Sequence, residues 1–155
     1  MKNLKPYCAT IDAGISGTGY AIWSENWKLI HSGIVTSREK SWDAKGKSIA
    51  ERLKTILNKE FPVAYVAIEM PAFFQSTGGQ VTARSGALVK LSWFVGLLAG
   101  TLRDKGIRYV SVPEWKGSLP KDVVERRIKK ILPKVKMRSH SVDAIGIGLY
   151  LAGRF

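Results

Sequence analysis

The segment from Val63 to Glu69 constrains the fold of this chain more than any other stretch. It is nearly continuous in apolar residues, ends in an acid, and is followed by Met70 and Pro71. An exposed antiparallel strand alternates apolar and polar residues, whereas a strand buried on both faces reads as a continuous apolar run. The run therefore predicts a strand of a parallel sheet that helices cover on both sides.

The segments on either side of this strand have strand and helix patterns in a definite order. We expect strands over residues 7–12, 18–23, 28–36, 63–69 and 107–112, and helices over 81–104, 121–132 and 139–153, with a loop over 114–120. A further helix, capped by Ser41 and stopped by Pro62, has Ile49, Leu53, Ile56 and Leu57 on one face. This order predicts an α/β domain with a mixed five-stranded sheet, three antiparallel strands and then two parallel ones, and helices on both faces.

The length and the charge narrow the class of protein. With 155 residues the chain has room for one domain, which we expect to span residues 1–155. Its 25 Lys and Arg against 12 Asp and Glu give a net charge of +13, which indicates an anionic partner. A membrane surface or a ribosomal neighbour would also fit that charge, but the chain has no long basic amphipathic helix, and nucleic acid is favoured.

The cysteine count and the hydropathy suggest where the protein works. The lone Cys8 can form neither an intramolecular disulfide nor a cysteine-based zinc site, which is consistent with a reducing compartment. The N-terminal residues lack the apolar core of a signal peptide, and the most apolar stretch, 91–99, is too short to span a bilayer. We expect a soluble, cytoplasmic protein that does not bind membranes.

Two strands and one helix carry acidic residues at matching ends. Asp12 ends the first strand and Glu69 ends the fourth, while His140 and Asp143 are three residues apart at the start of the last helix. Each alone has an ordinary explanation: a turn cap for Asp12, a surface position for His140, and a complement to the helix dipole for Asp143. Glu69 is harder to explain, because a buried acid is costly unless it is paired or bound to metal. Together the four residues predict a site for hard divalent cations.

The motifs around these residues resemble those of the RuvC-type Holliday-junction resolvases, which belong to the ribonuclease-H-like nucleases. The resemblance is carried by the run from Ile11 to Tyr20, by Val66 to Glu69, and by Ser139 to Ile147, and it extends over nearly the whole chain. The first motif by itself is also found in actin-like ATPases and sugar kinases, but those proteins need two such domains.

The resemblance implies a homodimer that nicks four-way DNA junctions symmetrically with two Mg²⁺ per site, for which Mn²⁺ would substitute. Asp12, Glu69, His140 and Asp143 would be the catalytic metal ligands. Asp12 would bridge both ions, Glu69 would serve the ion of the leaving group, and the other two would serve the ion that activates water.

Candidate DNA contacts lie outside the acidic motifs. Phe73 or Phe74 would probe the junction by stacking on bases, unless both anchor their loop to the core. Basic residues concentrate between 116 and 138, and Lys116 and Lys121 resemble DNA-contacting lysines of the family. Further candidates in this stretch are Arg126 and Lys130, and weaker ones outside it are Arg84 and Lys90.

Two other functions remain compatible with the same residues. A nuclease of this fold acting on RNA precursors or RNA–DNA hybrids would have a similar metal site, and the residues alone do not separate DNA from RNA. A catalytically silent nucleic-acid-binding module would keep the fold, although the intact acid set argues against it. The helix over 81–104 is apolar on more than one side, so it either serves as a dimer interface or is fully buried.

Overall fold

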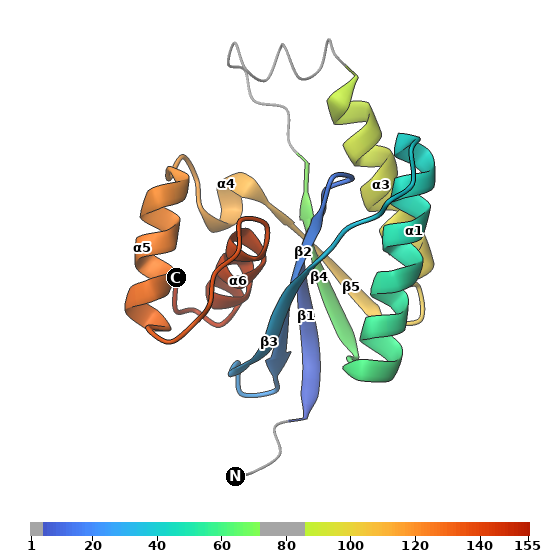
Figure 1. Ribbon diagram of the computed structural model, residues 1–155. Helices are drawn as coiled ribbons and strands as arrows, with labels where there is room; N and C mark the ends of the chain where they lie inside the picture. The colour runs from blue at the N-terminus through green and yellow to red at the C-terminus, as the bar shows by residue number, and fades with distance from the viewer. Residues whose placement is uncertain (1–4, 72–85) are drawn as a thin grey trace.

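The computed structural model describes residues 5–71 and 86–155, and these contain a five-stranded sheet with the order β3-β2-β1-β4-β5 (Figure 1). The strands are β1 (Pro6–Asp12), β2 (Thr18–Ser24), β3 (Leu29–Val35), β4 (Tyr65–Met70) and β5 (Gly106–Ser111). Strands β1, β2 and β3 pair antiparallel, while β4 lies parallel to both β1 and β5. The predicted mixed sheet is confirmed.

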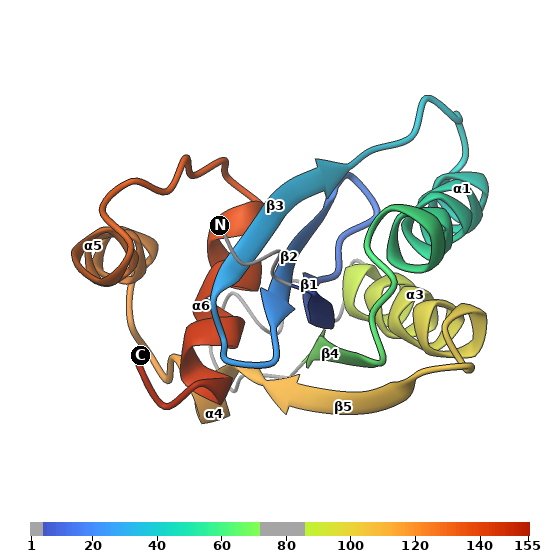
Figure 2. The ribbon, with the colours of Figure 1, turned by 90° about the horizontal axis from the view of Figure 1, so that it is seen from below.

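Helices cover both faces of the sheet, as expected. They are α1 (Trp42–Thr55), which continues into the π-helical turn η1 (Ile56–Glu60), α3 (Ala87–Thr101), α4 (Val112–Trp115), α5 (Lys121–Ile131) and α6 (Ser141–Leu151). Figures 1 and 2 show α1 and α3 on one face, and α4, α5 and α6 on the other. The ribonuclease-H-like arrangement expected from the sequence is therefore present.

Each face of the sheet has its own hydrophobic core, because alternate residues of a strand point to opposite sides. In β1, Ala9 and Ile11 pack with α1 and α3, whereas Cys8 packs with α5 and α6. In β4, Val66 and Ile68 join the first core and Ala67 joins the second. The part of the apolar run from Val66 to Ile68 is thus buried on both faces, as predicted, whereas Ala64 and Tyr65 at its start are exposed.

Three predicted boundaries are wrong. The helix expected over 81–104 does not run through Gly86, which has a φ of 73° in the left-handed region, so α3 begins at Ala87 and ends at Thr101. The loop expected over 114–120 begins with α4 instead, since Ser111 and Glu114 form a reciprocal capping box around it. The last helix spans Ser141–Leu151 rather than 139–153, which leaves His140 at its N-cap.

Helix α3 is buried along one side only. Phe94, Val95, Leu98 and the following Leu102 lie in the core, whereas Val89 is 69% exposed. Gly96 and Gly100 are also exposed, and a Cβ added to either would meet no atom within 4 Å. Full burial of this helix within the chain is therefore excluded for its described part. None of the helices in residues 5–71 and 86–155 combines the length and hydropathy that crossing a membrane requires.

Candidate metal centre

The register between β1 and β4 brings Asp12 and Glu69 to the same place on the sheet. Ile11 pairs with Ile68 across the two parallel strands, so the two acids each follow by one residue. Each acid also lies two residues beyond a side chain that faces α6, namely Thr10 in β1 and Ala67 in β4. Strand alternation therefore turns both carboxylates toward the helix that carries Asp143.

Helix α6 is held against β1 and β2 by close backbone contacts. The Thr10 hydroxyl donates a hydrogen bond of 2.6 Å to the carbonyl oxygen of Ala144, the neighbour of Asp143. A Cβ added to Gly19 in β2 would lie only 1.8 Å from the carbonyl oxygen of His140, so no larger residue fits there. These contacts fix the first turn of α6, and with it Asp143, beside the ends of β1 and β4.

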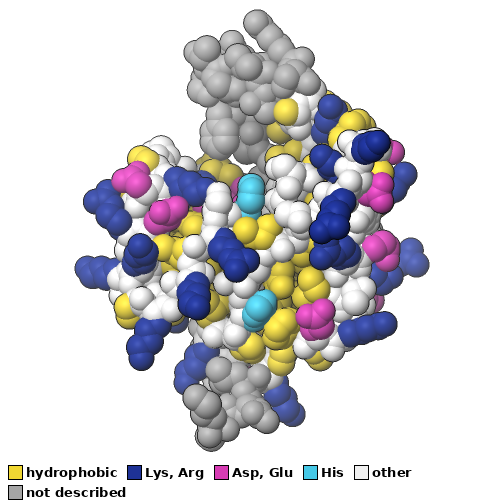
Figure 3. Space-filling view, viewed as in Figure 1, with side chains coloured by type: hydrophobic (Ala, Val, Ile, Leu, Met, Phe, Trp, Pro, Cys, Tyr) yellow, Lys and Arg dark blue, Asp and Glu magenta, His cyan; other side chains and the backbone are white. Residues whose placement is uncertain are grey.

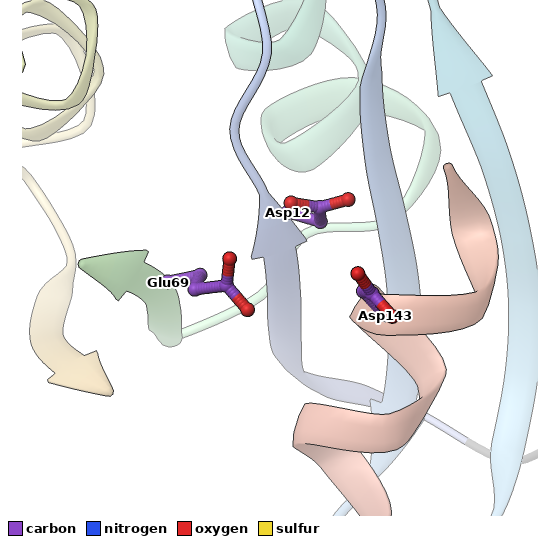
Figure 4. Close-up of side chains that lie close together, drawn as sticks. All are labelled: Asp12, Glu69 and Asp143. Atoms are coloured by element: carbon purple, nitrogen blue, oxygen red, sulfur yellow. The ribbon is translucent and has the colours of Figure 1, made fainter. Parts of the chain in front are cut away.

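The three acids form a compact cluster. One oxygen from each of Asp12, Glu69 and Asp143 lies within 4.8 Å of the other two, and Figure 4 shows the carboxylates converging from β1, β4 and α6. All three residues are partly buried. Carboxylate oxygens at this spacing are the donor set that Mg²⁺ and Mn²⁺ prefer.

Mutual repulsion and burial make the metal-free cluster electrostatically unfavourable. The pKa of Asp12 rises from 3.8 to about 8, chiefly because burial disfavours its charge and then because Glu69 and Asp143 repel it. Burial likewise raises the pKa of Glu69, against the opposing effects of a hydrogen bond from Trp115 and the charge of Lys116. A bound divalent cation would remove this repulsion.

Trp115, the last residue of α4, and Lys116, which follows it, partly offset the repulsion between the acids. The Trp115 indole donates a hydrogen bond of 2.8 Å from Nε1 to Glu69 Oε2. The Lys116 ammonium lies 3.1 Å from Asp143 Oδ2, and both side chains are 19% exposed. Sequence reasoning did not identify Trp115, because no sequence pattern links an indole in a presumed loop to a carboxylate 46 positions earlier.

The cluster fits a metal ion because it contains an acceptor that the described residues leave without a partner. Asp143 Oδ1 is buried and forms no hydrogen bond there. A buried carboxylate oxygen in this state is costly unless something else binds it. The donor set is entirely of hard oxygen atoms, which favours Mg²⁺ or Mn²⁺ over softer metals.

His140, the fourth expected ligand, is not part of the cluster defined by the 4.8 Å spacing. It is the N-cap residue of α6, and its ring lies next to Gly17, where an added Cβ would be 3.3 Å from His140 Cδ2. The ring therefore lies beside the turn that follows Asp12. Its role as a metal ligand remains a prediction.

The predicted DNA-contacting residues fall into four groups, one of which is Lys90 alone, exposed on α3. Lys116 lies 3.1 Å from Asp143 of the cluster, and Lys121 Nζ is 3.1 Å from Ser139 Oγ, shortly before α6. The charges of both lysines lower the pKa of Asp12. Arg126 and Lys130 are exposed on α5, where Arg126 forms an ion pair with Asp122. Phe73, Phe74 and Arg84 lie outside the described residues.

Comparisons with known proteins give fold-level matches. No protein-family model and no curated protein sequence matches this chain. The structure of Thermus thermophilus RuvC matches with a TM-score of 0.66 and 20% identity, over 92% of this chain and 91% of that one. T. thermophilus RuvC in complex with a Holliday junction substrate matches with a TM-score of 0.66 and 21% identity, over 92% of this chain and 90% of that one. The yeast mitochondrial Holliday junction resolvase Ydc2 matches with a TM-score of 0.57 and 14% identity, over 99% of this chain and 80% of that one. At these identities the likeness establishes the fold.

Proposed function

We propose that this chain is a RuvC-type resolvase, a divalent-metal-dependent endonuclease that resolves four-way DNA junctions by paired symmetric nicks. The observation that carries the proposal is the cluster of Asp12, Glu69 and Asp143, with oxygens within 4.8 Å, at one end of a RuvC-like sheet. In an ion pair that only stabilises the fold, each acid faces a base. Here three acids lie together, and a single lysine, Lys116, forms an ion pair with one of them.

The chemistry assigned to this site is hydrolysis of a phosphodiester bond. When bound, divalent ions supply Lewis-acid activation of the phosphate and of the attacking water. Asp12, Glu69 and Asp143 would hold these ions, with His140 as a further ligand, and the indole of Trp115 would orient Glu69. Lys116 and Lys121 stand beside the acids and would bind phosphates of the substrate strand.

Two facts support DNA junctions as the substrate. The net charge of +13 suits a polyanion. The structural neighbours include a RuvC bound to a Holliday junction and a mitochondrial Holliday junction resolvase. Contacts from Arg126, Lys130, Phe73 and Phe74 to the DNA are part of the same proposal.

A homodimer is also part of the proposal, because symmetric resolution requires two active sites on one junction. The exposed side of α3, with Val89, Gly96 and Gly100, is the surface on which we expect the second copy to pack. Small residues allow two helix backbones to approach closely, and a two-fold axis would place the same surface of each copy in contact.

A nicking assay tests the proposed function. Four-way junction, fork, duplex and RNA–DNA hybrid substrates of matched sequence would be incubated with Mg²⁺, with Mn²⁺ and with EDTA, beside the Asp12→Asn variant. We expect paired cuts in the junction, dependent on metal and absent in the variant. Preferred cleavage of the hybrid would replace the resolvase with a ribonuclease of the same fold. Binding without cleavage under all conditions would identify a silent binding module.

A further inference from the structure

A second basic surface lies next to the turn between β1 and β2, on the side of the sheet covered by α1 and α3. It is an open pocket of about 380 Å³ whose lining includes Ser16, Lys40, Trp42, Lys45 and Lys90. We call it the Trp42 pocket. None of the three clustered acids lines it, and neither does any residue of the basic stretch 116–138.

Trp42 presents an aromatic surface at the first residue of α1. Its side chain is 40% exposed, although large aromatic residues are usually buried. The ring of Trp93 meets it edge-on at 5.0 Å, and the Lys90 ammonium lies 5.4 Å from its ring centre. The indole therefore packs against Trp93 and Lys90 while a large part of its surface remains exposed to solvent.

All charged side chains that line the Trp42 pocket are positive. Three lysines line it, and no described carboxylate does. Two acids are next in sequence to lining residues: Glu39 precedes Lys40, and Asp43 follows Trp42. Asp43 interacts with Lys47 on the next turn of α1, at 3.8 Å. An exposed indole among lysines that form no ion pair with a described residue is the combination that binds single-stranded nucleic acid, since bases stack on the ring and phosphates pair with the ammonium groups.

The Trp42 pocket is connected to the metal centre through the turn between β1 and β2. Ser16 belongs to the short turn that directly follows Asp12, and Ala13 and Ile15 of that turn pack on the α1–α3 core. Lys116 and Lys121 lie on the other side of Asp12, with α4, α5 and α6. Figure 3 shows Lys and Arg side chains on both sides of the molecule, over α5 and over α1. A strand that crosses the acids would thus meet basic residues on both sides.

We propose that the Trp42 pocket binds the substrate strand beside the scissile phosphate, with an unpaired base stacked on Trp42 and adjacent phosphates held by Lys40, Lys45 and Lys90. This inference rests on the proposed function, because it assumes a DNA substrate opened at the point of strand exchange. It assigns the pocket a role in selecting branched DNA over duplex, in which no base is free to stack.

Binding without cleavage tests the stacking contact. In the Asp12→Asn background, Trp42→Ala should weaken the affinity for a four-way junction by roughly 5- to 100-fold, and Trp42→Phe by much less, because it keeps an aromatic ring. Affinity for duplex should change little. A junction with 2-aminopurine beside the point of strand exchange should lose fluorescence on the parent protein, and lose less on Trp42→Ala, since stacking quenches that base.

Salt dependence tests the phosphate contacts. Replacing Lys40, Lys45 and Lys90 together by Ala should reduce the slope of log affinity against log salt by about 0.7 to 0.9 per lost phosphate contact. Lys59→Ala, which removes an exposed lysine in η1 after the C-terminal end of α1, is the matched control and should contribute only a weak general charge effect.

The outcomes separate the two proposals. If the parent binds and cuts junctions while the Trp42→Ala and triple-lysine variants bind as tightly and with the same salt slope, the pocket proposal is overturned and the proposed function stands. A parent that binds no nucleic acid overturns both. Melting temperatures identify variants that fail to fold, and if Trp42→Ala is one of them, the 2-aminopurine signal of the parent protein and the triple-lysine variant decide the question.

Discussion

The indole N–H of Trp115 donates a hydrogen bond to Glu69 Oε2 over 2.8 Å, which joins α4 to the acid at the end of β4. The ring is only 3% exposed, and it packs so closely on α6 that a Cβ on Gly146 would lie 2.5 Å from it. The ammonium of Lys116 lies 4.8 Å from the same ring and bonds Asp143. One buried side chain therefore positions groups that act on two of the three acids.

Trp115→Phe is the first prediction. The substitution keeps an aromatic ring in the pocket but removes the donor that orients Glu69. Outer-shell partners of metal ligands are typically worth 10- to 100-fold in metal affinity or activity, so we expect the Mg²⁺ concentration for half-maximal cleavage to rise by about that factor. Cleavage at saturating Mg²⁺ should recover most of the lost rate. Calorimetric titration of Mg²⁺ should report the same weakening without DNA.

Trp23→Phe provides the matched control for that experiment. Trp23 is also fully buried on this side of the sheet, and its Nε1 donates to Thr10 Oγ1 at 2.9 Å rather than to a metal ligand. Trp23→Phe should therefore lower the free energy of unfolding by about 1–3 kcal/mol, because the Thr10 hydroxyl loses one hydrogen-bond partner and the core loses packing. It should leave the Mg²⁺ concentration for half-maximal cleavage close to that of the parent. An equal rise in both variants would mean that Trp115 acts only through packing.

Asp12→Asn should abolish cleavage and preserve the fold. The amide keeps the shape of the carboxylate but lacks the negative charge with which Asp12 would hold divalent cations, so we expect the cleavage rate to fall by several orders of magnitude. Junction affinity should remain within a few-fold, because phosphate contacts from basic residues supply most of the binding. Gel-shift and cleavage assays on one junction check both parts. Cleavage at the parent rate would refute the assignment of Asp12 to the metal site.

The pH dependence of stability follows from the raised pKa of Asp12. Its pKa is about 8 in the folded protein against 3.8 for the unperturbed group. The unfolded chain therefore releases the proton first, and the stability of the metal-free protein falls as the pH rises from about 4 to 8. Asp12→Asn removes this term, so the variant should melt at a higher temperature than the parent near pH 8, and the difference should shrink toward pH 4. Thermal melts in EDTA across this range measure it.

Added Mg²⁺ should reverse this trend in the parent protein. Ion binding requires the ionised carboxylate, so the stabilisation by Mg²⁺ should grow as the pH approaches 8. The Asp12→Asn variant should gain less from Mg²⁺ at every pH. Equal stabilisation of both proteins would place the ion somewhere other than the acidic cluster.

The proposed dimer can be tested on the exposed side of α3. We expect sedimentation equilibrium at micromolar concentration to give twice the mass of the chain. Gly96→Arg should dissociate the dimer without unfolding it, because an added Cβ there meets no atom of the same chain within 4 Å. Lys59→Ala on η1 is a control that should leave the mass unchanged. A parent that is monomeric both free and on a junction would remove the symmetric mechanism.

The pattern of the chain was enough to predict the layers and the strand directions of the fold. Apolar runs and their order reveal which elements are strands, and a continuously apolar strand such as β4 must be covered on both faces. Asp12, Glu69 and Asp143 could be recognised because each carries a charge where its element is otherwise apolar. These are local properties, which a one-dimensional sequence records directly.

The details of the site depended on tertiary contacts. No pattern shows that Trp115 reaches Glu69 or that Lys116 reaches Asp143, because those contacts depend on how α4 packs under α6. The same holds for His140, which spacing placed with Asp143 but which α6 leaves at its N-cap, against Gly17. The Trp42 pocket likewise unites residues from a turn, α1 and α3. Periodicity determines which side of an element faces the core, but only packing between elements decides which side chains meet across it.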